Sequence, residues 1–259
     1  MDNTHQPTPE TTPPVPAPSS GGSKILIRLL AYGAALLLAA ALLLPNVRTV
    51  REPARRNSCM NNLKQIALAL SNYESARGEY PPAYTVDADG RPLHSWRTLI
   101  LPYMEQQPLY ESIDLTKPWD DPANKHAYNA MPEVYSCPSD LDAHEHPNFT
   151  NYLAIVTPES TIRRADSLAY GDLPNPAQTL LVVDAGPKHG VHWMSPVDAN
   201  EQLVLGLGPD SELPHNGNIF LAMYGDGHSE ALSVEVAPAV RRALITATDE
   251  DNKTLGDIE

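Results

Sequence analysis

The chain has 259 residues, of which 42% are hydrophobic and 19% charged, and its 32 acidic and 18 basic residues give a formal net charge of −14. This length allows one medium domain or two small ones with a substantial core. The acidic balance argues against a nucleic-acid-binding protein, because neutralising phosphates requires clustered cations. The 26 prolines, about twice ordinary usage, disfavour a bundle of long helices and a parallel α/β enzyme.

The N-terminal part is predicted to be a disordered tail followed by a membrane span. Residues 1–23 contain six prolines and a Ser/Gly run, too little apolar surface to offset the entropy of ordering. Residues 25–44 then carry a single charge, Arg28. With a rise of about 1.5 Å per residue, such a helix covers the roughly 30 Å hydrocarbon core of a bilayer. We therefore predict a transmembrane helix over residues 25–44, with a buried core helix as the alternative.

A long amphipathic helix is predicted after the span. Pro45 and Pro53 are expected to interrupt or kink the segment, with Pro53 as the first residue of a new helical stretch. The apolar residues of this stretch recur at spacings of four and three: Cys59, Leu63, Ile66, Leu70 and Tyr73. That spacing places one apolar stripe on an otherwise polar helix. Gly78, followed by two prolines, predicts its end.

Short helices and then short strands are predicted for the rest of the domain, which spans residues 45–248 before an acidic tail over 249–259. Ser95 is a candidate N-cap for a helix through Met104, and Asp120-Asp121-Pro122 similarly opens a short helix through Tyr128. The predicted strands cover residues 151–156, 179–184, 202–207, 219–224 and 229–232, and a closing helix covers 238–248. Strands separated by loops favour an antiparallel sheet, so the predicted fold class is α+β.

Several short motifs are distributed along the chain. The first is the segment 59–70, Cys-Met-Asn-Asn-Leu-Lys-Gln-Ile-Ala-Leu-Ala-Leu, followed by Asn72-Tyr73-Glu74. The later ones are Ser95-Trp96-Arg97, Leu101-Pro102-Tyr103, Pro118-Trp119-Asp120, Cys137-Pro138-Ser139 and Thr150-Asn151-Tyr152. Together these motifs resemble the signature of a bacterial prepilin-like family, the domain of unknown function 1559, over about residues 45–245. The resemblance implies a pilin-like architecture, a long N-terminal helix packed on a small antiparallel sheet, and no established activity.

The N-terminus departs from this family. Members begin with a prepilin leader in which a glycine cleavage site precedes Phe-Thr-Leu and a glutamate. Here Gly22 is followed by Ser23-Lys24-Ile25, with neither Phe nor Glu, and a proline-rich tail precedes it. We therefore predict a permanently anchored relative in which an ordinary membrane helix replaces the leader.

The two cysteines, Cys59 and Cys137, fall at matching motif positions of the family. The resemblance therefore implies a disulfide between the long helix and the sheet side, formed in an oxidising compartment. Two buried thiols are the alternative. Sequence assigns neither cysteine an activating base, and no nucleophile-elbow motif is present, so no catalytic residue and no enzymatic activity are predicted.

The histidines and acidic turns suggest no metal or cofactor. Histidines or acids lie near each other in sequence at His144 and His146, at His189 and His192, and at His215, Asp226 and His228. No Cys-x-x-Cys or His-Glu-x-x-His spacing accompanies them. We therefore predict solvated loop histidines. Residues 87–90, with two aspartates and a glycine, are predicted to form an ordinary acidic β-turn rather than a calcium loop.

Three tryptophans carry the alternative function, a membrane-anchored module that binds a sugar or another small solute. Trp96, Trp119 and Trp193 could line an aromatic pocket, although core packing is the commoner fate of tryptophan. A deep pocket lined by these rings would favour binding, whereas an exposed apolar sheet face would favour assembly.

Charge and family resemblance disagree about membrane orientation. Residues 24–64 hold seven cations and one acid, whereas residues 65–259 hold 11 cations and 29 acids. Arginines 48, 51, 55 and 56 follow the span, so the positive-inside rule predicts a cytoplasmic domain. The resemblance predicts the opposite, and we follow it. The prediction is a single-pass inner-membrane protein with an extracytoplasmic domain, which has a structural or interaction role with other envelope proteins or copies of itself.

Overall fold

The computed structural model describes residues 21–140, 145–164 and 166–247; between residues 21 and 51 it describes the side chains of residues 25–38 alone. Two compact units are present, residues 1–49 and 50–259. Helix α1 (Gly21–Arg77) has residues in both. Residues 1–20 and 249–259, which make up most of the predicted N-terminal tail and all of the C-terminal one, lie outside the described residues.

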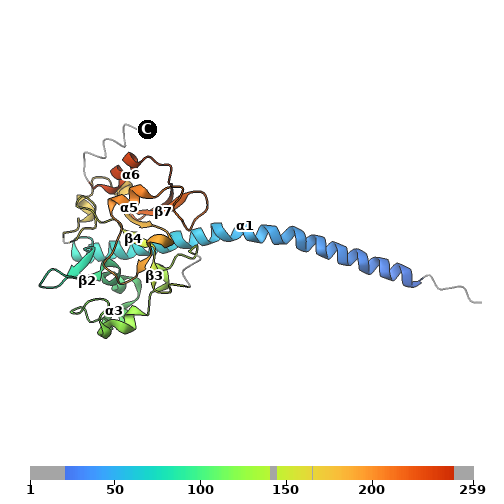
Figure 1. The fold of residues 1–259 in the computed structure, drawn as a ribbon, viewed down its shortest axis with the longest axis horizontal. Helices are drawn as coiled ribbons and strands as arrows, with labels where there is room; N and C mark the ends of the chain where they lie inside the picture. Colours follow the sequence, from blue (N-terminus) through green and yellow to red (C-terminus); the bar gives the residue numbers. More distant parts are fainter. Residues whose placement is uncertain (1–20, 141–144, 165, 248–259) are drawn as a thin grey trace, which may run out of the picture. The chain divides into compact units, whose positions relative to one another are not determined.

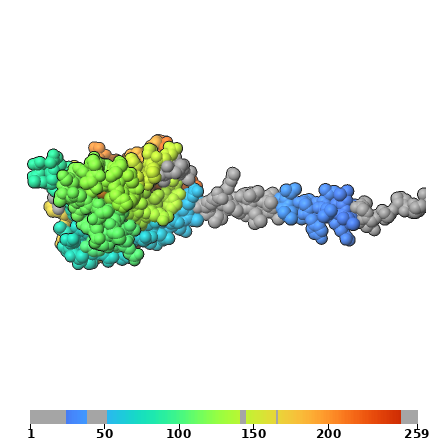
Figure 2. Space-filling view, turned by 90° about the horizontal axis from the view of Figure 1, so that it is seen from below, coloured from blue at the N-terminus to red at the C-terminus, as the bar shows by residue number. Residues whose placement is uncertain are grey.

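The part of α1 in the first unit carries the predicted membrane span. Residues 25–38 are all exposed, and they form the blue atoms of the space-filling view in Figure 2. The side chains of residues 39–44 lie outside the described set. Within the described part of the chain, no helix has the length and apolar character needed to cross a membrane.

The part of α1 in the second unit buries the predicted apolar stripe. Cys59, Leu63, Ile66 and Leu70 are fully buried, and Tyr73 is half-buried. Gly78 ends the helix: its φ is +86° and its N–H donates to the carbonyl of Glu74 at 2.7 Å, the glycine C-cap that the sequence predicts.

Of the two predicted effects of the prolines, an interruption or a kink, the interruption is wrong. Helix α1 continues through Pro45 and Pro53 rather than beginning again at Pro53. A proline removes a single backbone hydrogen bond from the helix interior. After Pro53, the stripe that begins at Cys59 packs into the core, and this burial favours the helix on that side of Pro53.

A four-stranded antiparallel sheet lies at the centre of the second unit (Figure 1). Its strands, in spatial order, are β4 (Tyr152–Ala154), β5 (Leu180–Asp184), β7 (Ile219–Tyr224) and β8 (Ser229–Ser233). Two smaller antiparallel pairs join β1 (Tyr84–Val86) to β2 (Pro92–Ser95), and β3 (Phe149–Thr150) to β6 (Val191–His192). The predicted α+β class with small antiparallel sheets is confirmed.

Strands β4, β5 and β7 of the central sheet are buried on both faces, whereas the edge strand β8 is mostly exposed or half-buried. Tyr152 and Leu221 belong to the core that includes the stripe of α1, whereas Leu153 and Phe220, their neighbours in sequence, belong to a second core. The second core also contains residues of α5 (Glu201–Gly206) and α6 (Pro238–Ile245). Since successive strand residues point to opposite faces, the sheet lies between α1 and these two helices, as Figure 1 shows.

Short helices fill the connections. These are α2 (Trp96–Leu99), η1 (Leu101–Met104), α3 (Gln107–Glu111), η2 (Pro122–Asn124), α4 (Lys125–Tyr128), η3 (Glu133–Tyr135), η4 (Tyr170–Asp172), η5 (Pro176–Gln178) and η6 (Pro187–His189). Asp121 accepts the Ala123 N–H at 2.8 Å, so its predicted capping role is confirmed. Ser95 is the N-cap residue of α2, as predicted, but its side chain makes no capping hydrogen bond; its hydroxyl donates to the carbonyl of Trp193 at 3.4 Å. Residues from this connecting region cover the side of the domain that Figure 2 shows in green.

One predicted strand is a helix. Residues 202–207 belong almost entirely to α5, which the side chain of Asn200 caps by accepting the Leu203 N–H at 2.8 Å. A short apolar run such as Leu-Val-Leu is compatible with either state. The capping asparagine three residues before it is the local signal that favours the helix.

Arg97 of α2 is fully buried and connects several loops. Its guanidinium lies 2.7 Å from Asp198 Oδ1 and donates to the carbonyl oxygens of Tyr152, Ser195 and Val197 at 3.2–3.3 Å. Burial raises the pKa of Asp198 to about 6, against the opposing effect of Arg97. The carboxylate is therefore charged and paired at neutral pH.

Candidate functional site

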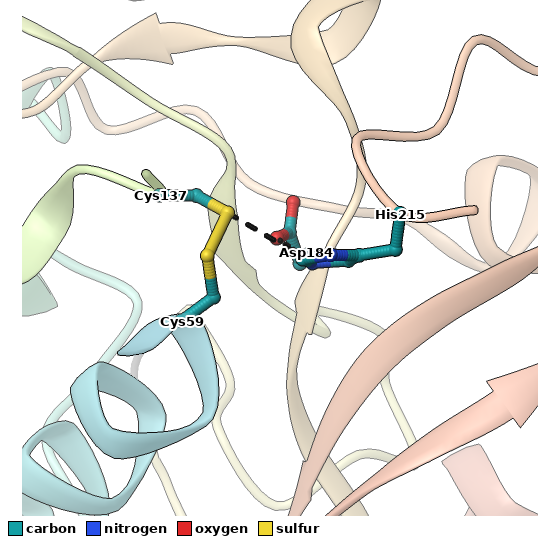
Figure 3. Close-up of side chains that lie close together, drawn as sticks. All are labelled: Cys59, Cys137, Asp184 and His215. Carbon is teal, nitrogen blue, oxygen red and sulfur yellow. Dashed lines mark hydrogen bonds and ion pairs between the residues drawn. A yellow bond between two sulfur atoms is a disulfide. The ribbon is translucent and has the colours of Figure 1, made fainter. Parts of the chain in front are cut away.

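Four buried side chains with redox-active or metal-ligating atoms meet beside α1 (Figure 3). Cys59 lies on the buried stripe of α1, Cys137 follows η3, Asp184 ends β5, and His215 lies in the loop before β7. One ligand atom from each residue lies within 4.8 Å of those of the other three. We call these four residues the cysteine–histidine cluster.

A disulfide joins Cys59 to Cys137, with their Cα atoms 5.1 Å apart. The pairing that the family resemblance implied is therefore confirmed. Next to it, the Asn62 amide donates to the carbonyl of Ser136 at 2.9 Å. Together these contacts fix α1 against the segment that follows η3.

His215 lies between two carboxylates. Its Nδ1 is 3.2 Å from Glu52 Oε1, and its Nε2 is 3.3 Å from Asp184 Oδ2 and 3.8 Å from Cys137 Sγ. Burial lowers the pKa of His215, but the hydrogen bonds to Asp184 and Glu52 raise it by more, so the net shift is upward. In the protonated ring, both N–H groups can donate to these carboxylates.

The expectation of solvated histidines is wrong for His215 and His192, which are 3% and 6% exposed. His215 does not pair with its sequence neighbours: the partners of its ring are 31 and 163 residues away. His228, by contrast, pairs with Asp226 and is partly exposed. Folding, rather than local spacing, therefore determines which histidine has acidic partners.

Glu52 was not singled out as a site residue from the sequence. It lies seven residues before Cys59, which is two turns of the helix, so both side chains project from one face. Its carboxylate accepts the hydroxyl of Ser139 at 3.3 Å as well as facing His215. The spacing from Cys59 is the signal that could have identified it.

The comparisons with known proteins give one match. A family model for proteins of unknown function, DUF1559, matches residues 48–203, more than half of the chain. This chain belongs to the DUF1559 family. No curated protein and no solved structure matches it. The matched region contains Glu52, Cys59, Cys137 and Asp184, whereas His215 lies beyond it.

The three tryptophans of this DUF1559 protein differ in exposure. Trp96 and Trp193 are fully buried: the Trp96 indole donates to Asp198 at 3.0 Å, and Trp193 stacks on Tyr135. Trp119 is partly exposed and stacks on Tyr128. A fully buried ring presents no face to a solute. Trp119 is therefore the one predicted ligand-binding tryptophan with a ring open to solvent.

His192 is held as a neutral ring within an aromatic stack. Its ring centroid lies 3.9 Å from that of Tyr128 and 5.0 Å from that of Trp119. Its Nε2–H donates to the carbonyl of Tyr128 at 3.1 Å, and its Nδ1 accepts the Met194 N–H at 3.3 Å. Burial, above all, lowers the pKa of His192 to about 4. A proton on Nδ1 would face another N–H.

We expect His192 to make the domain sensitive to acid. Its folded pKa of about 4 lies below the ordinary 6.5, so between these values the unfolded chain binds the extra proton. Proton binding by the unfolded chain therefore lowers the unfolding free energy as the pH falls below 6.5. The loss reaches about 3 kcal/mol at pH 4. Urea unfolding of wild type and His192→Phe across this pH range measures the effect. The unfolding free energy of the variant should depend less steeply on pH.

The control replaces His189, which is exposed, with alanine and should leave the pH dependence of wild type unchanged. Equal pH dependence for wild type and His192→Phe would contradict the assignment.

Proposed function

We propose that this DUF1559 protein is a membrane-anchored, pilin-like component of the cell envelope with a structural or interaction role and no enzymatic activity. The anchor is residues 25–44, and the domain that follows lies outside the cytoplasm. Its partners are other envelope proteins or copies of the same chain.

The exposed apolar segment of α1 is the observation that carries the proposal. Nine large apolar side chains between residues 25 and 38 are 60–74% exposed. At about 1.5–3 kcal/mol for each buried side chain, covering them is worth on the order of 10–20 kcal/mol. At about 100° per residue, consecutive positions such as 25, 26 and 27 point around the whole helix. Lipid covers every face of a helix, whereas a protein groove covers one.

Two further features support the proposal. The Cys59–Cys137 disulfide fits an oxidising compartment, because cytosolic reductants keep most thiols reduced. The packing of the α1 stripe against a four-stranded antiparallel sheet fits a pilin-like domain.

Introducing charge into the apolar segment tests the anchor. Leu36→Arg/Leu37→Arg should move the protein from the membrane pellet to the soluble fraction, because each arginine near the centre of a span costs about 2.5–3.5 kcal/mol. Leu68→Arg is the matched control: Leu68 is 63% exposed on the domain, and its replacement should leave the protein in the pellet. If the double variant stays in an alkali-washed pellet like wild type, residues 25–44 are not the anchor.

A further inference from the structure

The cysteine–histidine cluster has the composition of a closed metal site. Thiolate, imidazole and carboxylate are the protein ligands of zinc, and four of them complete its tetrahedral shell. Here two cysteines, one histidine and one aspartate converge from four separate segments, and all four side chains are buried. A structural zinc site requires this combination of full ligand count and exclusion of water.

The distances between the ligand atoms fit a tetrahedron around such an ion. With bonds of about 2.3 Å to sulfur and about 2.0–2.1 Å to nitrogen and oxygen, neighbouring ligand atoms lie about 3.3–3.8 Å apart. His215 Nε2 is 3.3 Å from Asp184 Oδ2 and 3.8 Å from Cys137 Sγ. Two edges of one tetrahedral face therefore already have the required length, and all four ligand atoms lie within 4.8 Å of one another.

A second, independent feature that supports a metal site is the Glu52 carboxylate, which contacts the His215 ring nitrogen that faces away from the cluster. Ligating histidines generally donate their other ring N–H to a carboxylate, which fixes the tautomer and the ring orientation. His215 directs Nε2 to the cluster and Nδ1 to Glu52 Oε1 at 3.2 Å, and Ser139 in turn donates to Glu52. Glu52 therefore occupies the position of an outer-shell positioning residue.

We propose that the thiol form of this chain binds one zinc ion through Cys59, Cys137, Asp184 and His215, and that metal binding and the disulfide exclude each other. Binding displaces the two thiol protons and, from a charged His215 ring, the proton on Nε2, all of which pass to the solvent. Oxidation by a small-molecule disulfide takes two electrons from the two thiolates, forms the Cys59–Cys137 bond, releases the oxidant as two thiolates and expels Zn²⁺. The oxidised form seen here and the zinc form are thus two states of one cluster.

The test compares oxidised and reduced full-length protein in detergent. A water-soluble phosphine reduces the disulfide, becoming the phosphine oxide with the oxygen of water, and is removed before titration with Zn²⁺ against a chromophoric chelator. The reduced protein should bind one zinc per chain about 100-fold or more tightly than the oxidised protein. Co²⁺ in place of Zn²⁺ should give sulfur-to-cobalt charge-transfer and intense tetrahedral d–d absorption in the reduced protein alone.

Variants separate this site from adventitious binding. In the reduced protein His215→Ala and Asp184→Asn should each weaken zinc binding about 100-fold or more, and Glu52→Gln about 10- to 100-fold. His228→Ala, which removes a histidine paired with an aspartate outside the cluster, should change affinity less than twofold. Equal binding by Cys59→Ala/Cys137→Ala and reduced wild type would overturn the proposal.

Folding is followed in the same titrations by near-UV circular dichroism. If reduction unfolds the domain, stoichiometric zinc should restore the folded signal, because a closed site couples binding to folding. A reduced chain that binds no zinc, whether folded or unfolded, overturns the proposal. None of these results depends on the membrane anchor, so failure of the proposed function leaves this test unaffected.

Discussion

Replacing Arg97 with alanine is expected to destabilise the domain by about 3–5 kcal/mol, the cost of breaking a buried ion pair from one side. The substitution leaves the buried Asp198 carboxylate without its cation at 2.7 Å. It also leaves the carbonyl oxygens of Tyr152, Ser195 and Val197 without their donor. Unfilled volume beside the Trp96 ring, over which the guanidinium lies, adds to the loss.

The matched control for Arg97 is Arg91→Ala. Arg91 pairs with Asp87 and Asp89 in the turn between β1 and β2, but its side chain is 74% exposed. Exposed ion pairs contribute about 0–1 kcal/mol to stability, so the unfolding free energy of this variant should be close to that of wild type. Urea unfolding in the same buffer measures both variants. Similar losses for the two arginines would show that the Arg97 network contributes nothing beyond a surface pair.

Removing the disulfide with Cys59→Ala/Cys137→Ala is expected to cost about 4 kcal/mol of unfolding free energy. The bond closes a loop between residues 78 apart, and for a loop of that length the chain-entropy model gives roughly 4 kcal/mol. Alanine is used rather than serine, because serine would place a hydroxyl group beside His215. Urea unfolding in the presence of a chelator measures the loss without any contribution from bound metal.

Chemical reduction provides the control for this variant. With chelator present, a reductant should shift the wild-type midpoint towards that of the double variant and leave the variant unchanged. A loss below about 1 kcal/mol, or a variant that still responds to reductant, would contradict the assigned role of the bond. The same variant then serves as the metal-free reference for the zinc titrations.

The sequence predicted those helices, caps and strands that are determined by residues close together in the chain. The stripe from Cys59 to Tyr73, the cap at Gly78 and the strand over 219–224 all match the structure. Each depends on periodicity or on one residue's backbone preference. The strand predicted over 202–207 is a helix because three consecutive apolar residues, 203–205, do not distinguish a strand from a short helix, and Asn200 caps the helix.

The candidate site could be predicted only in part, because its residues come together through tertiary folding. The family resemblance supplied the pair Cys59 and Cys137. His215 and Asp184 are 31 residues apart, and Glu52 is 163 residues from His215, so no spacing motif joins them. The tryptophans could not be placed from residue type alone: a binding pocket was the alternative, and two of the three rings fill the core, the commoner fate of this residue.

The proposed topology is tested most directly by labelling one engineered thiol. Asp89 lies in the β1–β2 turn with its side chain 75% exposed, and the native cysteines are joined in a disulfide. In intact spheroplasts a membrane-impermeant maleimide should label Asp89→Cys in the membrane fraction as fully as after lysis, whereas Ser20→Cys, across the proposed span, should label only after lysis. Labelling of Asp89→Cys only after lysis, with Ser20→Cys labelled in intact spheroplasts, would place the domain in the cytoplasm and contradict the proposal.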